Sequence, residues 1–173
     1  MAEENYMYGD ITAKEKEFEE YFTSTKSFYN FPCAHRQHKH DGNCHLIHGY
    51  SRSFHIVFGA QTMTKEGFLV DYGDLDGIKA WLTENYDHTF VVDYDDPWME
   101  TLQAMHDAGV CRLVVQEEGP GMEGTAYRIC TWADAWLRER TKGRAWVISV
   151  ESRENDKNSS IYTSPDAGFI GWT

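Results

Sequence analysis

The sequence predicts an α+β domain built on an antiparallel four-stranded sheet with two main helices on one face. Strand patterns come in pairs toward both ends of the chain, and two long helical patterns lie between them. This order is typical of domains whose helices segregate to one face of an antiparallel sheet. With 173 residues, the chain is long enough to bury one core without disulfide or metal support.

The first pair of strands is predicted over residues 27–34 and 50–60. Pro32 removes a backbone donor from the first strand, which favours an edge or bulged position. A polar loop with an Asp-Gly turn signal joins the two strands. Histidines at the ends of two such neighbouring strands can meet in space.

The residues before this hairpin are acidic and carry Phe18, Tyr21 and Phe22 at helical spacing. We therefore expect an N-terminal helical extension over residues 1–25. The main domain is expected to occupy residues 26–173.

Two long helices are expected between the strand pairs. The first follows Asp74 as its N-cap and ends near Tyr86, because the apolar residues between them recur at helical spacing. The second is expected over residues 121–140, where a basic last turn complements the helix dipole. Both present one apolar side and are expected to cover the sheet.

A small insert and two final strands complete the predicted domain. The insert combines a short helix from about Pro97 with a strand over residues 110–118. Alternating residues over 144–154 predict the third strand of the main sheet, and residues 161–164 predict the fourth.

Composition excludes several classes of function. The net charge of −12, from 28 acidic and 16 basic residues, argues against binding to a nucleic-acid backbone. A phosphorylated small molecule remains compatible with this charge, because backbone N–H groups and a few cations can hold one. We expect a cytoplasmic protein that binds no membrane, with reduced thiols, since the sequence shows neither a signal peptide nor a transmembrane run and no CxxC pair.

Histidine is concentrated in one stretch, residues 31–58, which holds six of the eight histidines and two of the four cysteines. A catalytic zinc ion takes three protein ligands, usually including histidine, and keeps one position for water or substrate. His35 and His48 lie at the ends of two predicted strands. The sequence therefore predicts a metal site formed around this pair.

Three further features indicate acid–base chemistry. Cys44 lies four residues before His48 and is a candidate nucleophile or general base, or else a metal ligand or an inert thiol. Asp87 and His88 are adjacent, so the carboxylate can orient the imidazole, although a polar pair at a helix end has the same pattern. Glu151 interrupts an apolar strand and is either a binding carboxylate or part of the polar side of that strand.

Taken together, these residues resemble the family of 6-pyruvoyl-tetrahydropterin synthase and 6-carboxytetrahydropterin synthase. The matching motifs occur in family order and cover most of residues 27–163. They are FPCAH (31–35), CHLIHG (44–49), GFLVDY (67–72), the Asp87-His88 pair and SVE (149–151). Each motif is short, and the ordered set is specific.

The resemblance implies a zinc lyase that acts on 7,8-dihydroneopterin triphosphate and eliminates triphosphate. By position, His35 and His48 would be zinc ligands and Cys44 would be the general base. Zinc would hold and polarise the side-chain hydroxyl groups of the substrate. The implied fold is the tunnelling fold, whose subunits join their sheets into a barrel with sites at subunit interfaces, so a homo-oligomer is expected.

The resemblance also assigns roles to residues farther along the chain. Asp87 and His88 would relay protons, and Glu151 would bind the amino and ring N–H groups of the pterin. Glu123 resembles a family glutamate at a subunit boundary, although the threonine that precedes it in the family is absent here.

The sequence departs from the family at the third zinc ligand. The family has His-Gly-His, whereas this chain has Tyr50 in the third position. His55 is the predicted replacement, on the assumption that a bulge corrects its odd offset from His48. Tyr50, His38 and His40 are the alternatives.

The spacing between Cys44 and His48 resembles the bacterial enzyme of the queuosine and deazapurine pathway. We therefore expect 6-carboxy-5,6,7,8-tetrahydropterin as the product. The alternatives are 6-pyruvoyl-tetrahydropterin synthase activity and a non-catalytic relative that only binds a pterin or purine. A purely structural zinc protein is disfavoured by the separate matches at Asp87-His88 and Glu151.

Overall fold

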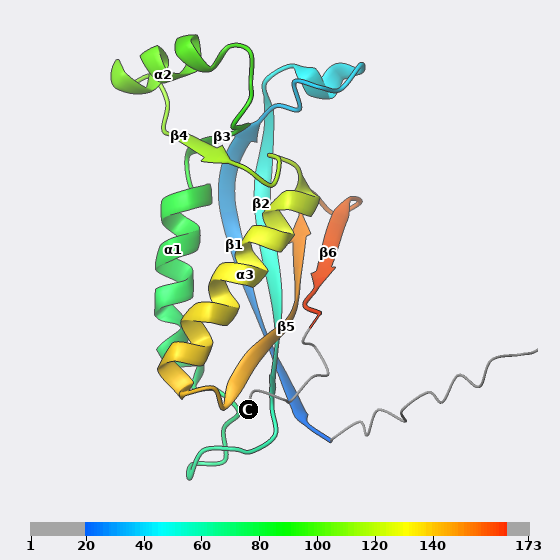
Figure 1. Ribbon diagram of the computed structural model, residues 1–173, viewed down its shortest axis with the longest axis vertical. Coiled ribbons are helices and arrows are strands. Elements are labelled where there is room, and N and C mark those ends of the chain that lie inside the picture. The colour runs from blue at the N-terminus through cyan, green and yellow to red at the C-terminus, as the bar shows by residue number, and fades with distance from the viewer. Residues whose placement is uncertain (1–19, 166–173) are drawn as a thin grey trace, which may run out of the picture.

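The computed structural model describes residues 20–165. Within them the chain forms one mixed sheet in the order β4-β3-β1-β2-β5-β6, with the helices α1 and α3 on one face (Figure 1). The strands are β1 (Phe22–His35), β2 (His48–Ala60), β3 (Thr89–Asp93), β4 (Leu113–Gln116), β5 (Ala145–Arg153) and β6 (Ser159–Thr163). The helices are α1 (Asp76–Tyr86), α2 (Met99–Asp107) and α3 (Met122–Thr141), with short 3₁₀ turns η1 (Asn43–His45) and η2 (Tyr72–Leu75).

The α+β class is confirmed, and the expected four-stranded antiparallel sheet is corrected to six strands. The four strands predicted for the main sheet are present as β1, β2, β5 and β6, and they pair antiparallel. The strand predicted in the insert, over residues 110–118, is also present as β4 and joins the same sheet. In addition, β3 runs parallel to both β1 and β4. All five residues of β3 are buried, and a strand buried on both faces lacks the alternation by which strands are recognised in sequence.

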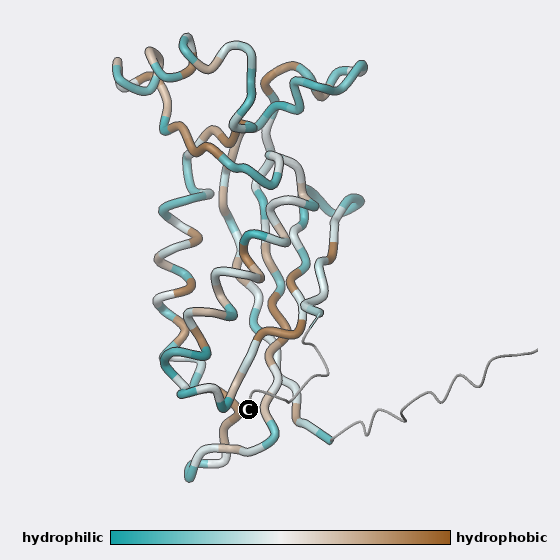
Figure 2. The backbone as a smooth tube through the Cα atoms, viewed as in Figure 1, coloured by the Kyte–Doolittle hydropathy of each residue, from teal (hydrophilic) through white to brown (hydrophobic). Residues whose placement is uncertain are grey.

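The main core lies between the sheet and the helices α1 and α3. Phe54 of β2 packs on Tyr86 at the end of α1 with ring centroids 5.2 Å apart, and Trp81 stacks on Trp132 of α3 at 4.4 Å. Figure 2 shows hydrophobic positions recurring along both helices and the strands, whereas the connecting loops are largely hydrophilic. A second small core, around Phe90 and Leu102, fixes α2 and β4 at one end of the molecule.

A bulge in β1 decides which side chains face this core. Phe28 pairs with Phe54 and Phe31 pairs with Arg52, so Tyr29 and Asn30 together face one residue of β2. Asn30 adopts a left-handed conformation with φ of 67°, which a short polar side chain tolerates. The predicted alternative of a bulged strand near Pro32 is therefore correct, and β1 is a central strand rather than an edge.

Two predicted boundaries differ in the structure. Phe22 to Thr25 belong to β1 and not to a helical extension, and the rest of the expected extension up to residue 19 lies outside the described residues. Asp74 is not the N-cap of α1, because it lies within the 3₁₀ turn that precedes the helix. Within residues 20–165, the structure contains no helix long and apolar enough to cross a membrane.

Candidate metal centre

The ends of β1 and β2 bring His35 and His48 together, as predicted. The two residues are direct partners in the antiparallel ladder, and their ring centroids lie 4.2 Å apart. Gly49 permits this close pairing, since a Cβ at that position would lie 2.6 Å from the carbonyl oxygen of Cys33. A carboxylate joins the pair, because Oε1 of Glu154 lies 3.9 Å from Nε2 of His35.

His35, His48 and Glu154 offer donor atoms that all lie within 4.8 Å of one another. Nδ1 of His48 is 2.8 Å from the carbonyl oxygen of Leu46. A carbonyl only accepts hydrogen bonds, so Nδ1 carries the proton and Nε2 keeps its lone pair for a metal. Nδ1 of His35 is buried with no hydrogen-bond partner among the described residues. Two imidazoles and a carboxylate of this kind fit a zinc ion.

The imidazole of His35 is held in its neutral form. Burial, followed by the nearby charge of Arg52 and by His48, lowers the pKa of His35 from 6.5 to about 3. Only a neutral imidazole binds a metal. His35 is therefore ready to coordinate at neutral pH without first losing a proton.

Acid is expected to destabilise the metal-free protein through His35. Below pH 6.5 the unfolded chain takes up a proton that the folded His35 refuses until about pH 3, so stability falls as pH falls through this window. The contribution is at most about 1.4 kcal/mol per pH unit. Urea unfolding in chelator at pH 7 and pH 5 should show a smaller pH dependence for His35→Gln than for the unchanged protein. His88→Gln is the matched control, since His88 is exposed, and equal pH dependence for His35→Gln would contradict the prediction.

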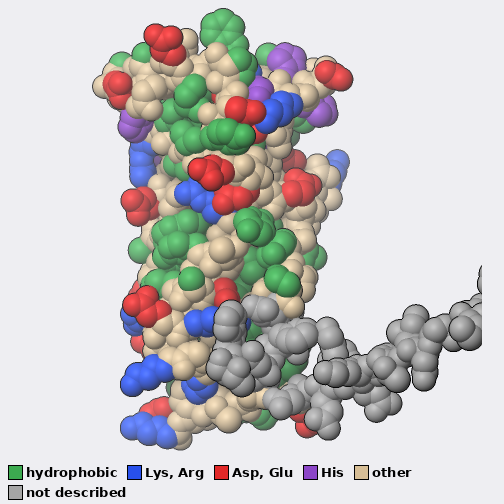
Figure 3. Space-filling view, in the orientation of Figure 1, with side chains coloured by type: hydrophobic (Ala, Val, Ile, Leu, Met, Phe, Trp, Pro, Cys, Tyr) green, Lys and Arg blue, Asp and Glu red, His purple; other side chains and the backbone are tan. Residues whose placement is uncertain are grey.

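A cavity of about 470 Å³ opens over the candidate centre. Cys44 and Glu123 line it together with His35, His48 and Glu154. The thiol of Cys44 is exposed on η1, and Glu123 stands in the first turn of α3. In Figure 3 the visible histidine side chains gather at this end of the molecule.

His55, the predicted third ligand, does not join the group. The register shift between His48 and His55 has its extra residue in β1 and none in β2, so no bulge turns His55 toward the face that carries His48. Seven residues of extended strand also separate the two by about 23 Å. Nδ1 of His55 instead lies 2.8 Å from Oγ of Ser27, so the structure does not bring His55 to His35 and His48.

Glu151 also lies away from the cavity that His35 and His48 line. It is the cross-strand partner of His55, so both side chains share the face opposite the helices. Its carboxylate binds Nη1 of Arg153 at 2.6 Å. The structure places Glu154 at the cavity instead, three residues later and beyond the end of β5, where strand alternation no longer predicts direction.

Asp87 and His88 form the predicted pair, with Oδ1 and Nδ1 2.7 Å apart. The imidazole is exposed, and His88 has a left-handed φ of 56°. Within one chain, however, His88 lines a different cavity, which it shares with Cys33, Tyr50 and Cys111. One copy of the protein does not bring the Asp87-His88 pair to Cys44.

The alternative third ligands differ in their surroundings. Tyr50 is 44% exposed, with its ring centroid 6.2 Å from that of His48. His40 lines the cavity, but its Nδ1 accepts a hydrogen bond from the backbone of Gly42. His38 belongs to a separate group of acidic residues. Among the residues considered, Glu154 is the one that complements His35 and His48.

Arg52 is a residue that the sequence analysis missed. It is fully buried in the core, where its guanidinium donates to Oγ1 of Thr125 and to the carbonyl oxygen of Pro120, each at 3.3 Å. These bonds connect β2 to the start of α3, which carries Glu123. Its position in the sequence gave a signal, because it alternates with the core residues Phe54 and Ile56.

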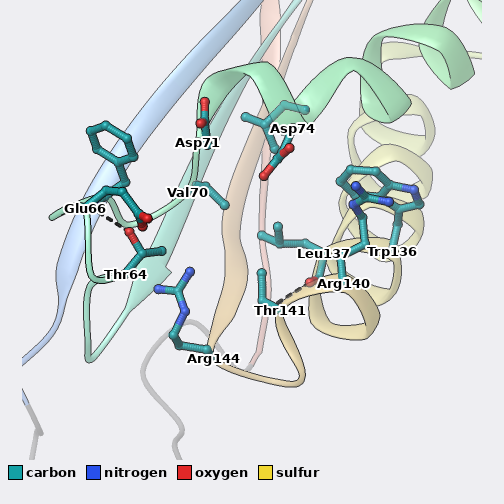
Figure 4. Close-up of a pocket in the computed structure, with 12 residues that line it drawn as sticks. Thr64, Glu66, Val70, Asp71, Asp74, Trp136, Leu137, Arg140, Thr141 and Arg144 are labelled. Carbon is teal, nitrogen blue, oxygen red and sulfur yellow. Dashed lines mark hydrogen bonds between the residues drawn. The ribbon is translucent and has the colours of Figure 1, made fainter.

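A larger cavity of about 600 Å³ lies at the far end of α3 (Figure 4). Trp136, Arg140 and Arg144 line it beside Asp74 and Glu66. The guanidinium of Arg144 has a structural role, since it donates to the carbonyl oxygens of Thr62 and Leu69 at 2.7 and 2.8 Å. None of the predicted site residues lies there, so the cavity at His35 and His48 is the better candidate.

Comparison with known proteins supports a specific family. The family described as 6-pyruvoyl tetrahydropterin synthase matches residues 24–165. The 6-carboxy-5,6,7,8-tetrahydropterin synthase of Rickettsia conorii is 33% identical over 70 residues, which cover 40% of this chain and 51% of that protein. The enzyme of the same name from Aquifex aeolicus is 25% identical over 84 residues, covering 48% and 52%. The chain thus spans about half the length of the curated relatives it matches.

Solved structures share the fold. An uncharacterized protein from Wolinella succinogenes superposes with a TM-score of 0.65 at 22% identity, covering 83% of this chain and 98% of that one. The 6-pyruvoyl tetrahydropterin synthase of Caenorhabditis elegans gives a TM-score of 0.58 at 16% identity, covering 84% and 96%. At these identities the likeness establishes the fold alone.

Proposed function

The chain belongs to the 6-pyruvoyl tetrahydropterin synthase family, and from this membership we propose that it is a zinc-dependent lyase. The proposed reaction converts 7,8-dihydroneopterin triphosphate to 6-carboxy-5,6,7,8-tetrahydropterin and eliminates triphosphate. The names of the bacterial relatives support this choice of product. The observation that carries the proposal is one cavity that combines two imidazoles, a carboxylate and the thiol of Cys44.

His35, His48 and Glu154 are the proposed zinc ligands, with Glu154 in place of His55. The hydrogen bond from Nδ1 of His48 to the carbonyl oxygen of Leu46 orients the His48 ring and leaves its Nε2 for the metal. Burial keeps the imidazole of His35 neutral. When bound, zinc supplies a Lewis acid for the side-chain hydroxyl groups of the substrate. The ligand set leaves room for substrate, as a catalytic site with three protein ligands does.

Cys44 is the proposed general base, and Glu123 the proposed carboxylate for the N–H groups of the pterin. Both line the cavity over the two histidines. A thiolate at Cys44 would accept a side-chain proton of the bound substrate. A carboxylate at Glu123 would accept hydrogen bonds from the pterin and fix its orientation. Glu123 thus takes the binding role expected of Glu151, which lies on the other face of the sheet.

Asp87 and His88 are proposed to act in the site of a neighbouring copy. They are paired and exposed but lie at a different cavity from Cys44. A homo-oligomer that packs this surface against the Cys44 cavity would supply a proton relay from the partner. The barrel assembly expected of the fold is the arrangement that we propose for this contact.

The purified full chain should release triphosphate from 7,8-dihydroneopterin triphosphate. Mass spectrometry of the pterin products is expected to show the 6-carboxy compound, with zinc near one equivalent per chain. A 6-pyruvoyl product would move the activity to the sister synthase. Tight pterin binding without turnover by zinc-loaded protein would overturn the lyase proposal and favour a binding protein.

A further inference from the structure

A second group of metal-binding side chains lies beside the candidate centre but shares no residue with it. It joins the loop that follows β1 to the segment that follows β3. We call it the loop cluster, and its members are His38, Asp93 and Asp95, whose donor atoms all lie within 4.8 Å of one another. Donors bound to one ion about 2 Å away are about 3 to 4 Å apart, so small side-chain movements would complete such a site.

The imidazole of His38 is enclosed by carboxylates. Its Nε2 lies 3.4 Å from Oδ1 of Asp95, and its Nδ1 lies 3.9 Å from Oδ2 of Asp96. Only 10% of the His38 side chain is exposed. An imidazole combined with carboxylate oxygens is a donor set that suits divalent ions such as Mn²⁺.

Asp93 provides an independent indication that a cation is needed. The residue is 8% exposed, and its Oδ1 is buried without a hydrogen-bond partner among the described residues. A buried carboxylate oxygen without a donor is costly, and coordination of a metal is one of the usual ways to offset that cost. Asp93 also belongs to the group whose donors converge.

A flexible cation already occupies part of this space. Nζ of Lys39 lies 2.7 Å from Oδ2 of Asp95 and 3.2 Å from Oδ2 of Asp93. The Lys39 side chain is 61% exposed, so it can leave without disturbing the core.

The charges here do not balance. Asp93, Asp95 and Asp96 carry three negative charges against Lys39 and Arg36, whose Nε lies 3.1 Å from Oδ2 of Asp96. Among these five side chains one negative charge is left over. A divalent ion that replaced the ammonium of Lys39 would cancel this excess.

We propose that the loop cluster is a second divalent-cation site, in which an ion of the Mn²⁺ type binds His38, Asp93 and Asp95 and displaces Lys39. The site holds the loop after β1 against the end of β3. Lys39 also lines the cavity over His35 and His48, so its release would add a mobile cation to that cavity. The site does not depend on the proposed pterin chemistry.

Electron paramagnetic resonance of Mn²⁺ added to the zinc-loaded full chain tests this proposal. One Mn²⁺ per chain is expected to bind. Asp93→Asn should weaken binding at least about tenfold, and Lys39→Met should strengthen it by about as much, since a competing charge is removed. Asp107→Asn, on the surface of α2, is the matched control and should bind as the unchanged protein does.

His48→Ala separates this site from the candidate centre, because it should lose zinc but keep Mn²⁺ binding. Circular dichroism of each variant establishes that it is folded. Equal Mn²⁺ affinity in folded Asp93→Asn and the unchanged protein would overturn the proposal. A lack of saturable Mn²⁺ binding in both the unchanged protein and Lys39→Met would also overturn it.

Discussion

Cys44→Ala is expected to lower kcat for 7,8-dihydroneopterin triphosphate by about 10² to 10⁴, the usual contribution of a positioned general base. Because Cys44 is exposed on η1, the stability change should stay within about 0.5 kcal/mol. Binding of the pterin substrate, measured by calorimetry, should be nearly unchanged. His45→Ala is the matched control, since His45 shares the same turn but does not line the cavity. Turnover by Cys44→Ala close to that of the control would remove Cys44 from the mechanism.

The same variant tests whether the site is shared between copies. His88→Ala should also be inactive, although His88 lines a different cavity from Cys44. Mixed oligomers of Cys44→Ala and His88→Ala would contain some sites with both residues intact. Co-expression of the two should therefore recover part of the activity. If the mixed oligomers remain as inactive as the separate variants, Asp87 and His88 do not complete the site of a neighbour.

His48→Ala is expected to abolish zinc binding, whereas His55→Ala should leave it unchanged. His48 presents a free Nε2 to His35 and Glu154, while His55 bonds Ser27 on the opposite face of the sheet. Zinc per chain should fall from near one to near zero for His48→Ala, when measured after equilibration in a zinc buffer that fills only the tight site. Loss of zinc in His55→Ala would restore the ligand set predicted from sequence.

Glu154→Gln resolves the role of the carboxylate at this site. If Glu154 is a zinc ligand, Glu154→Gln should lower the zinc affinity by at least about 10- to 100-fold, the loss that is usual when a residue supporting a metal ligand is removed. Glu151→Gln is the matched control, because Glu151 pairs with Arg153 away from the cavity. Full zinc content in Glu154→Gln together with weakened pterin binding would instead make Glu154 a substrate ligand.

The sequence determined the parts of the site that depend on local pattern. His35 ends the first strand of one hairpin and His48 begins the second, so their meeting followed from antiparallel pairing. Cys44 was a candidate from its short distance to His48 in the chain, whereas Glu123 came only from the resemblance to the family. The α+β class and the four antiparallel strands rested on alternation and helical spacing, which are local as well.

Tertiary structure decided what depends on long-range pairing and on the side of a strand. A one-residue offset turns a side chain to the other face, and the bulge that shifts this register lies in β1 at Asn30, where it does nothing for His55. For the same reason Glu151 points away, while Glu154 beyond the strand reaches the cavity. The parallel strand β3 depends on β1 and β4, which are distant in the chain. Its buried position removes the alternation that would have revealed it, and it is β3 that delivers Asp93 to His38.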